Sequence, residues 1–257
     1  IRENPMELYH RDFGELLGNF MVWYLRKMLK KMDIITSPSF ALKDSLKIDM
    51  NIDSIAVPNG IDQRVFFPMK RKKELREKLS LPLNQKIFIS VGRVVNSKNY
   101  NFLCEVWSKS ITNSSLIILG KGELLNKLRE KYRNMFPNII FFGEKNNVAE
   151  YLNAADYYVS SSLTEGLPNS VLEALATGLP VLLSNIPAHK EFFNNGFDIG
   201  NLYKNNDAED FLNNYNTLLQ KEYSTLSSNC ISLVNKYYTA KKNAEEYEKI
   251  YFKILTK

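Results

Sequence analysis

The fold is decided by the stretch EGLPNSVLEALATG, residues 165–178. Pro168 suits the first turn of a helix because its missing N–H would have no partner there, and Gly178 is a stop signal. We therefore expect a helix from about residue 168 to residue 177. Glu165 lies just before this helix and Glu173 lies five residues into it, about 7 to 8 Å along the axis at 1.5 Å per residue. Two carboxylates therefore flank the start of one helix.

Strand-like runs flank this helix on both sides. Residues 155–162 (ADYYVSSS), which are rich in aromatic and β-branched side chains, precede it, and residues 180–185 (PVLLSN) follow it. The pattern predicts a βαβ unit and an α/β fold. Ligands of such units bind beyond the carboxyl ends of the strands, where a helix N-terminus presents free N–H groups. Gly166 would let the backbone and a ligand approach closely.

Glu173 lies among apolar neighbours at positions 171, 172 and 174–176. A carboxylate in this setting is costly unless it has polar partners, and the hydroxyls of a ligand would be suitable. The alternative is an ordinary helix whose acidic residues favour its first turns. For the two glutamates alone, both interpretations have equal weight.

Glu165 and Glu173 resemble the E-x7-E signature of the retaining family-four glycosyltransferases. The block from Ser162 to Val181 is similar to the donor site of that family. Three further elements follow the family's order: PNGID at residues 58–62, GRVVNSK at 92–98 and the G-x-G turn at 120–122. The resemblance covers about residues 54–191. It implies a Rossmann-like parallel sheet flanked by helices, the donor half of the two-domain B-type glycosyltransferase fold.

The resemblance also implies roles for single residues. Arg93 and Lys98 would bind the donor diphosphate and stabilise the charge that develops on it, an arrangement that suits an Arg fork and a Lys point charge. Glu165 would lie at the donor sugar and Glu173 at the ribose hydroxyls, while the segment from 143 to 148 would border the base. Catalytic roles would fall to Glu165, Arg93 and Lys98. Donor-binding positions would be Gly92, Arg93, Lys98, Glu165, Gly166, Leu167, Pro168, Asn169 and Glu173.

Two of these motifs have simpler interpretations. Without the two glutamates, Arg93 and Lys98 would be interpreted as cations of a solvated loop. The G-x-G turn lacks the third glycine of a dinucleotide fingerprint, so it predicts only a tight turn near the nucleotide. No D-x-D motif is present, and the two cations would make a catalytic metal unnecessary. We therefore expect no metal and no cofactor, because the nucleotide-sugar is a substrate.

The chain is expected to have three parts. Residues 1–53 are predicted to be a helical remnant of the acceptor domain, and residues 54–238 to be the nucleotide-sugar-binding Rossmann-like domain. Residues 239–257 would be a C-terminal helix that packs back toward the first part, within a segment expected to be helical from 223 onward. The first residue is Ile1 rather than Met, which suggests a fragment.

Composition limits the class of protein. The chain has 257 residues, 44% hydrophobic and 24% charged, which is typical of a globular protein. The net charge of +6 favours anionic partners such as nucleotide phosphates, anionic lipid or nucleic acid. Cys104 and Cys230 are isolated, so we expect no disulfide framework and a reducing compartment. With no apolar run of about 18 residues and no visible signal peptide, we predict a cytoplasmic protein.

Residues 5–32 are predicted to form one long amphipathic helix with a basic side. Such a helix can lie on an anionic membrane, which would give a peripheral membrane contact, but docking on its own domain is favoured. His10 and His189 are more simply explained as structural or surface residues than as catalytic ones. The apolar positions of the helix are Phe13, Leu16, Leu17, Phe20, Met21, Tyr24, Leu25, Met28 and Met32.

The resemblance implies a retaining glycosyltransferase of the hexosyl type. It would move a sugar from a nucleotide diphosphate-sugar to a hydroxyl of a glycan or lipid-linked acceptor, in bacterial surface polysaccharide synthesis, without binding nucleic acid. The alternatives are a nucleotide-sugar epimerase or phosphorylase of the same architecture, or a non-catalytic nucleotide-binding fragment. A nicotinamide dehydrogenase is disfavoured because the glycine fingerprint is missing. The base, the sugar and the acceptor stay open, and the fragment alone is expected to be inactive in transfer.

Overall fold

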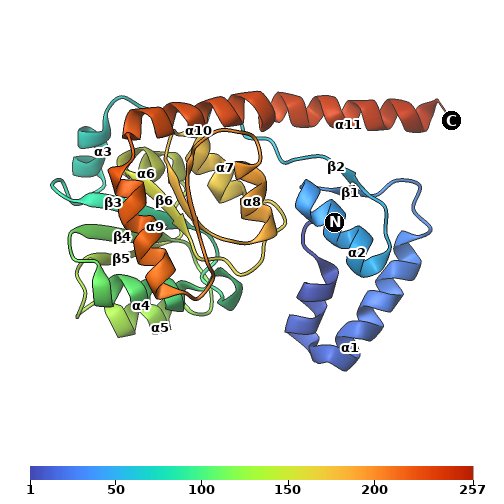
Figure 1. Ribbon diagram of the computed structural model, residues 1–257, viewed down its shortest axis with the longest axis horizontal. Helices are drawn as coiled ribbons and strands as arrows, with labels where there is room; N and C mark the ends of the chain where they lie inside the picture. Colours follow the sequence, from blue (N-terminus) through green and yellow to red (C-terminus); the bar gives the residue numbers. More distant parts are fainter. Residues whose placement is uncertain (257) are drawn as a thin grey trace.

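The computed structural model describes residues 1–256, which form a small N-terminal segment, a larger α/β domain and a protruding C-terminal helix (Figure 1). The N-terminal segment has a two-stranded parallel sheet, in which Thr36 pairs with Ile55 and Ser37 with Ala56. A small core of its own holds the segment together, with Val22, Leu46 and Met50 among its buried residues. Its elements are α1 (Pro5–Leu29), β1 (Thr36–Ser37), α2 (Phe40–Met50) and β2 (Ile55–Ala56).

Six parallel strands form the central sheet of the α/β domain, in the order β5-β4-β3-β6-β7-β8 (Figure 1). The chain builds outward from β3 to β5 and then returns to the other side of β3, where β6 lies. The loops after β3 and β6 therefore leave neighbouring strands in opposite directions, which is where open α/β sheets bind ligands. The strands are β3 (Lys86–Val91), β4 (Ser114–Leu119), β5 (Ile139–Gly143), β6 (Tyr157–Ser160), β7 (Val181–Ser184) and β8 (Gly200–Tyr203).

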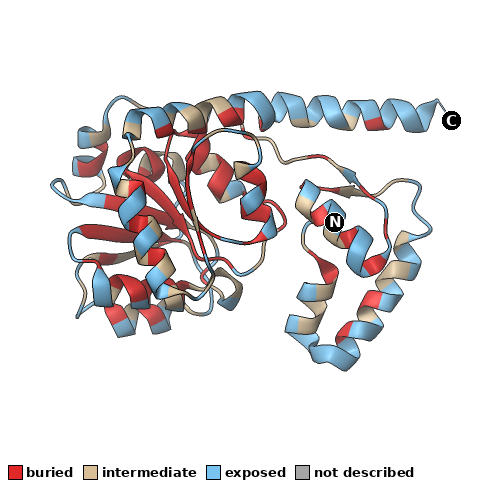
Figure 2. Cartoon of the chain, viewed as in Figure 1, coloured by how far each residue is buried: buried red, intermediate tan, exposed pale blue. Residues whose placement is uncertain are grey.

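Helices cover both faces of this sheet, and the strands are therefore buried on both sides (Figure 2). Ile87 and Ile89 belong to one core and Phe88, between them, belongs to the other, as the alternation of a strand requires. The α/β fold class expected from the sequence is confirmed. The helices are α3 (Lys72–Lys78), α4 (Tyr100–Ser110), α5 (Leu125–Tyr132), α6 (Val148–Ala154), α7 (Asn169–Ala176), α8 (Pro187–Phe193), α9 (Ala208–Gln220), α10 (Tyr223–Tyr237) and α11 (Ala240–Leu255), with a short 3₁₀ helix, η1, at Asn96–Lys98.

The first helix differs from the prediction, because α1 is a helical hairpin rather than one long helix (Figure 1). Gly14 has φ +75° and ψ 175° and breaks the helix, a conformation that costs glycine little because it has no Cβ. The second arm then folds back, and Gly18 lies so close to His10 that a Cβ there would be 2.5 Å from His10 Cδ2. Much of the predicted apolar face is exposed, with Leu16 at 91% exposure.

The C-terminal segment, predicted as continuous helix, is broken at Tyr238 and Thr239. There it runs beside the connection from the N-terminal segment: Ile61 N–H donates to Tyr238 O at 2.8 Å, and Ala240 N–H donates to Ile61 O at 3.0 Å. Gly60 fits this crossing because a Cβ would lie 2.5 Å from Thr239 O. Beyond it, α11 extends past the domain, and Ile250 is its one buried residue among those described (Figure 2). The predicted packing of this helix against the first part is therefore slight.

Candidate active site

The candidate site lies at the carboxyl ends of β3 and β6. Arg93 is in the loop after β3, and η1 in the same loop carries Lys98. Glu165 is in the loop after β6, just before α7. The switch in strand order between β3 and β6 thus brings together the three residues predicted to be catalytic.

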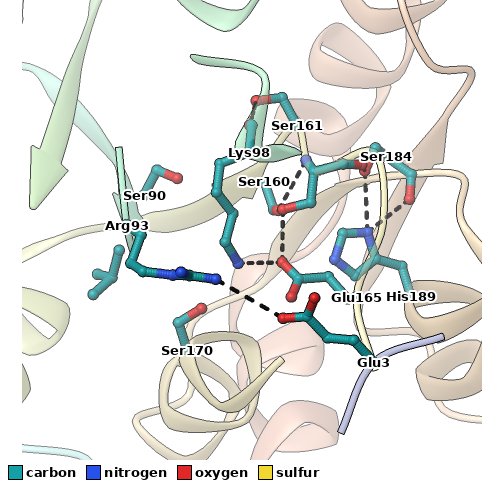
Figure 3. A network of polar contacts seen from close by, with 12 residues as sticks. Glu3, Ser90, Arg93, Lys98, Ser160, Ser161, Glu165, Ser170, Ser184 and His189 are labelled. Atoms are coloured by element: carbon teal, nitrogen blue, oxygen red, sulfur yellow. Dashed lines mark hydrogen bonds and ion pairs between the residues drawn. The ribbon is translucent and has the colours of Figure 1, made fainter. Parts of the chain in front are cut away.

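Lys98 and Glu165 form an ion pair at the centre of the site (Figure 3). Lys98 Nζ contacts Glu165 Oε1, and Ser162 Oγ donates a hydrogen bond to the same oxygen at 2.8 Å. Both charged side chains are largely buried, at 18% and 14% exposure. A charge pair removed from water needs such additional hydrogen bonds, because desolvation costs are high.

A group of serines fixes the two loops of this ion pair. Ser161 Oγ donates to the Lys98 carbonyl at 2.8 Å, while Ser184 Oγ donates to the Ser162 carbonyl at 2.6 Å. Leu163 N–H also donates to Ser97 O at 2.8 Å. The sequence interpretation gave no role to the hydroxyls of Ser161 and Ser184, because it assigned both residues only to strands. Consecutive hydroxyls at the carboxyl end of a strand in a βαβ unit were the available signal.

His189 lies beside Glu165, next to Ser184, and is fully buried (Figure 3). Its Nδ1 is 2.8 Å from Ser184 O, so this nitrogen carries the proton and donates it. Burial lowers the pKa of His189 to about 4, and the ring is therefore neutral at physiological pH. Within residues 1–256, its Nε2 has no hydrogen-bond partner. The position agrees with a structural role. His10 contacts Asn19 across the hairpin of α1 at 2.9 Å and is not at this site.

Arg93 is different from Lys98, because its side chain is 71% exposed. Its nearest carboxylate is Glu3 of the N-terminal segment, with 3.8 Å between Arg93 Nη2 and Glu3 Oε1 (Figure 3). An ion pair of this length on the surface contributes little stability. Arg93 is therefore available to a ligand.

The N-terminal segment approaches the donor-site loop at Gly166. A Cβ at this position would be 1.8 Å from the Arg2 carbonyl oxygen, so only glycine fits. Ser39 Oγ also donates to the Gly166 carbonyl at 2.7 Å. This corrects the expectation that Gly166 makes room for a ligand, because the neighbour it admits is the backbone of the N-terminal segment.

A cavity of about 270 Å³ lies between the N-terminal segment and the start of α7. Asn59, from the PNGID motif, helps to form it by donating to Asn169 Oδ1 at 2.8 Å and to Leu167 O at 3.3 Å. The cavity is therefore lined both by the PNGID motif, residues 58–62, and by the block that begins at Glu165. Its lining residues are Arg2, Glu3, Pro38, Asn59, Lys98, Glu165, Gly166, Leu167, Pro168, Asn169 and Ser170.

A second hollow of about 230 Å³ contains the other end of the predicted donor site. Gly92 and Arg93 line it together with Glu144, Lys145 and Val148, from the segment expected to border the base. Lys98 connects the two hollows, because its Cε would lie 3.6 Å from a Cβ on Gly92.

The G-x-G turn has a packing role. A Cβ on Gly120 would be 1.8 Å from Gly92 O, and one on Gly122 would be 2.3 Å from Val94 O. These glycines therefore let the loops after β3 and β4 touch, which sets the position of Arg93. Gly120 also lines the second hollow.

Glu173 lines neither hollow, although it follows Ser170 by one turn of α7. Burial raises the pKa of Glu173 from its ordinary value of 4.5 to about 7. The carboxyl group is therefore part protonated near neutral pH. A ligand that donates hydrogen bonds to it would favour the ionised form.

A larger cavity of about 760 Å³ lies elsewhere, where α8, α10 and α11 meet the N-terminal segment. The largest pocket is the default candidate for a binding site. Here, however, it is lined by none of Arg93, Lys98, Glu165 or Glu173. The smaller hollows at the sheet edge carry the buried ion pair and the exposed Arg93, and we assign the site to them.

Two other properties of the described residues bear on ligands. No group of three or more His, Cys, Asp or Glu side chains in residues 1–256 is arranged to hold a metal ion. Within the same part of the chain, no helix has the length and apolar character needed to cross a bilayer.

Comparison with curated proteins finds relatives of this chain. The chain is 33% identical over 205 residues to the Escherichia coli UDP-Gal:alpha-D-GlcNAc-diphosphoundecaprenol alpha-1,3-galactosyltransferase, which covers 76% of this chain and 53% of that protein. It is 30% identical over 187 residues to the Streptococcus pneumoniae alpha-monoglucosyldiacylglycerol synthase, covering 68% of this chain and 42% of that protein. The chain thus spans about half the length of the curated relatives it matches.

Comparison with solved structures supports the fold. A sucrose-phosphate synthase from Thermosynechococcus elongatus superposes with a TM-score of 0.84 at 19% identity, over 98% of this chain and 67% of the other. The Anabaena protein HepE, solved with UDP-glucose, gives a TM-score of 0.79 at 17% identity, over 89% and 66%. The sequence model of one family, described as "Glycosyl transferases group 1", matches residues 71–243, which is more than half of the chain. The chain therefore belongs to the group 1 glycosyltransferase family.

Proposed function

We propose that this chain carries the donor site of a retaining glycosyltransferase, and that the site binds a nucleoside diphosphate sugar. The observation that supports this most strongly is the buried Lys98–Glu165 pair at the start of α7, with Arg93 exposed beside it. Cations and a helix N-terminus at a sheet edge suit a diphosphate. The neighbouring cavity, lined by polar groups, suits a sugar.

The proposed reaction transfers a hexose to an acceptor hydroxyl with retention at the anomeric carbon. The bond between the anomeric carbon and the diphosphate oxygen breaks, and its electron pair stays on the diphosphate. A bond to the acceptor oxygen forms on the same face, and the acceptor hydroxyl gives its proton to the departing diphosphate oxygen. Arg93, Lys98 and the first N–H groups of α7 stabilise the negative charge that grows on the leaving group. These fixed positive charges supply that role without a metal ion.

Glu165 and Glu173 have different roles in this proposal. Glu165 is held by Lys98 and Ser162, and its carboxylate accepts hydrogen bonds from the donor sugar. Glu173 accepts hydrogen bonds from both ribose hydroxyls, which offsets the cost of its burial. Leu167, Pro168 and Asn169 form the wall of the sugar cavity, while Gly92 keeps the diphosphate close to the backbone of the loop after β3.

Names of relatives guide the choice of donor and acceptor. The E. coli relative is named as using UDP-Gal and a diphosphoundecaprenol-linked acceptor, and the S. pneumoniae relative as making a glycolipid. We infer a UDP-sugar donor and a glycan or lipid-linked acceptor, in the synthesis of a bacterial surface glycan. The reaction would take place in the cytoplasm, with peripheral contact to the membrane that holds the acceptor.

Calorimetry with UDP, GDP and ADP in the presence of EDTA tests this function. We expect UDP to bind with micromolar to millimolar affinity, and UDP-sugars to compete with it. A panel of UDP-sugars then identifies the sugar by the rise in melting temperature that each one causes. Absence of binding by all three nucleotides would refute the donor-site assignment.

A further inference from the structure

Glu3 is the one acidic residue of the N-terminal segment that lines the 270 Å³ cavity at the donor site, among residues 1–256. Its position is fixed on both sides. On one side, the Arg2 backbone packs against Gly166, and the backbone nitrogen of Ile1 donates to Thr36 O, in β1, at 2.8 Å. On the other side, the buried Asn4 caps α1 by accepting from Met6 N–H at 3.0 Å. Glu3 is thus directed at the site by structured neighbours.

Arg93 and Lys98, the two cations predicted to bind the diphosphate, each have a carboxylate as partner in this structure (Figure 3). Glu165 pairs with Lys98 in a largely buried contact that also includes Ser162. Glu3 pairs with Arg93 across 3.8 Å, without a hydrogen bond and with both side chains partly in water. The first pair belongs to the donor domain, whereas the second joins the donor domain to the N-terminal segment.

The two pairs differ in how easily a phosphate replaces the carboxylate. An exposed pair at this distance contributes little stability, and a diphosphate offers Arg93 more charge and the two-point contact that a guanidinium favours. Once a phosphate occupies Arg93, Glu3 is left a few ångströms from a like charge, which is unfavourable. Binding of the nucleotide therefore has to overcome the repulsion between Glu3 and the phosphate. The free-energy cost of this repulsion rises with the charge of the phosphate group.

We propose that Glu3 is a specificity residue of the donor site that competes with the nucleotide's diphosphate for Arg93. The proposal rests on the donor site described above. Glu3 weakens binding of the free nucleoside diphosphate that each transfer leaves behind, and so favours its release. Glu3 belongs to the N-terminal segment. The contact between that segment and the donor domain therefore also depends on whether a phosphate is bound.

The test compares Glu3→Gln with the wild-type chain by calorimetry at low salt, using UDP, UMP and uridine as probes. We expect UDP to bind about two- to five-fold more tightly to the variant, since an exposed charge pair has an effect of that size. The gain should be smaller for UMP and absent for uridine. It should also shrink as salt rises, because added ions screen exposed charges. A purely structural role of Glu3 would change all three probes alike.

Glu7→Gln is the matched control, because Glu7 is also on the N-terminal segment but contacts Thr164 Oγ1 rather than a cation of the site. We expect it to leave UDP affinity unchanged. In an Arg93→Ala background, the gain from Glu3→Gln should disappear. Unchanged or weaker UDP binding by Glu3→Gln, or an equal gain in Glu7→Gln, overturns the role of Glu3 while wild-type binding of UDP upholds the donor site. If neither the wild type nor Glu3→Gln binds UDP, both proposals fail.

Discussion

Arg93 and Lys98 show how two cations of one loop acquire different properties. Lys98 is largely buried and already paired, so it holds Glu165 in place. Arg93 is exposed and weakly paired. It would therefore lose less interaction energy than Lys98 on exchanging its present contact for a phosphate. The sequence motif does not distinguish the two residues. In the structure, Lys98 positions Glu165, whereas Arg93 is available to a ligand.

Arg93→Ala should weaken UDP binding by about 1.5 to 3 kcal/mol, the value of a hydrogen bond to a charged group. Calorimetry in EDTA measures this loss. Arg64→Ala is the control, because Arg64 is an exposed arginine whose partner is Asp62, away from the two hollows. Equal affinity in wild type and Arg93→Ala would remove Arg93 from the site.

Glu173→Gln should weaken ribonucleotides more than their 2′,3′-dideoxy analogues, because only the ribose hydroxyls use the carboxylate. The measurement is the ratio of UDP to dideoxy-UDP affinity in each protein. Equal losses for both ligands would contradict the ribose assignment. Glu150→Gln serves as the control, since Glu150 is on α6, where it accepts hydrogen bonds from Lys78 and Asn147.

The pKa of Glu173 also predicts a pH dependence of stability. Burial raises this pKa from 4.5 to about 7, so between these values the folded chain binds a proton that the unfolded chain has lost. Stability from this group is therefore greatest below pH 4.5 and decreases as the pH rises through 7. Urea unfolding from pH 5 to pH 8 should show that wild type loses stability relative to Glu173→Gln. Parallel pH profiles of the two proteins would show that Glu173 is not buried in this way.

At the scale of elements, the sequence predicted the βαβ unit around α7 well, because Pro168 and Gly178 mark its ends locally. It did not predict the hairpin of α1. The apolar spacing of residues 5–32 continues through Gly14, and an isolated glycine is compatible with a helix. The break becomes favourable only when the two arms pack together at Gly18 and His10, a contact that no local pattern encodes.

The contact between the loops after β3 and β4 leads to the next prediction. Gly120→Ala would place a Cβ 1.8 Å from Gly92 O at φ +146°, so the loop that carries Arg93 has to move. We expect a loss of stability of several kcal/mol, or no folding, and any folded protein should bind UDP more weakly.

Gly196→Ala is the control, because Gly196 has φ +75° with nothing within 4 Å of the added Cβ. It should cost about 1 to 2 kcal/mol and leave UDP affinity unchanged. Chemical denaturation and calorimetry measure both effects, and equal results for the two variants would contradict the packing role.

At the scale of the whole molecule, the site depends on contacts between segments far apart in the sequence. Glu191 on α8 accepts a hydrogen bond from Ala41 N–H at the start of α2 at 2.9 Å, and Ser39 contacts Gly166. The family motifs predicted which loops meet at the carboxyl edge of the sheet, since they lie on those loops. They did not predict Glu3, because its importance comes from the docking of the N-terminal segment against Gly166 and not from any motif that contains it.

This docking places only a few residues of the N-terminal segment against the sugar cavity: Arg2, Glu3 and Pro38, with Asn59 from the connection. The chain also covers only 53% of the E. coli galactosyltransferase that it resembles. We therefore predict that this chain alone folds and binds UDP but does not transfer sugar efficiently. Few groups are present to hold an acceptor beside the donor sugar. The reaction therefore lacks the lowering of its activation free energy that comes from holding both reactants together, which can be as large as about 7 to 11 kcal/mol.

The assay for this prediction measures sugar transfer from each UDP-sugar to a panel of lipid-linked and oligosaccharide acceptors, with UDP binding measured on the same sample. Glu165→Gln, which removes the charge beside the sugar, gives the background rate. We expect wild type and Glu165→Gln to be equally slow, although wild type binds UDP. A wild-type rate of about 1 s⁻¹ or more, typical of enzymes, would contradict the prediction. It would mean that the N-terminal segment, or a second copy of the chain, completes the acceptor site, and size-exclusion chromatography of the active sample would then distinguish these two cases.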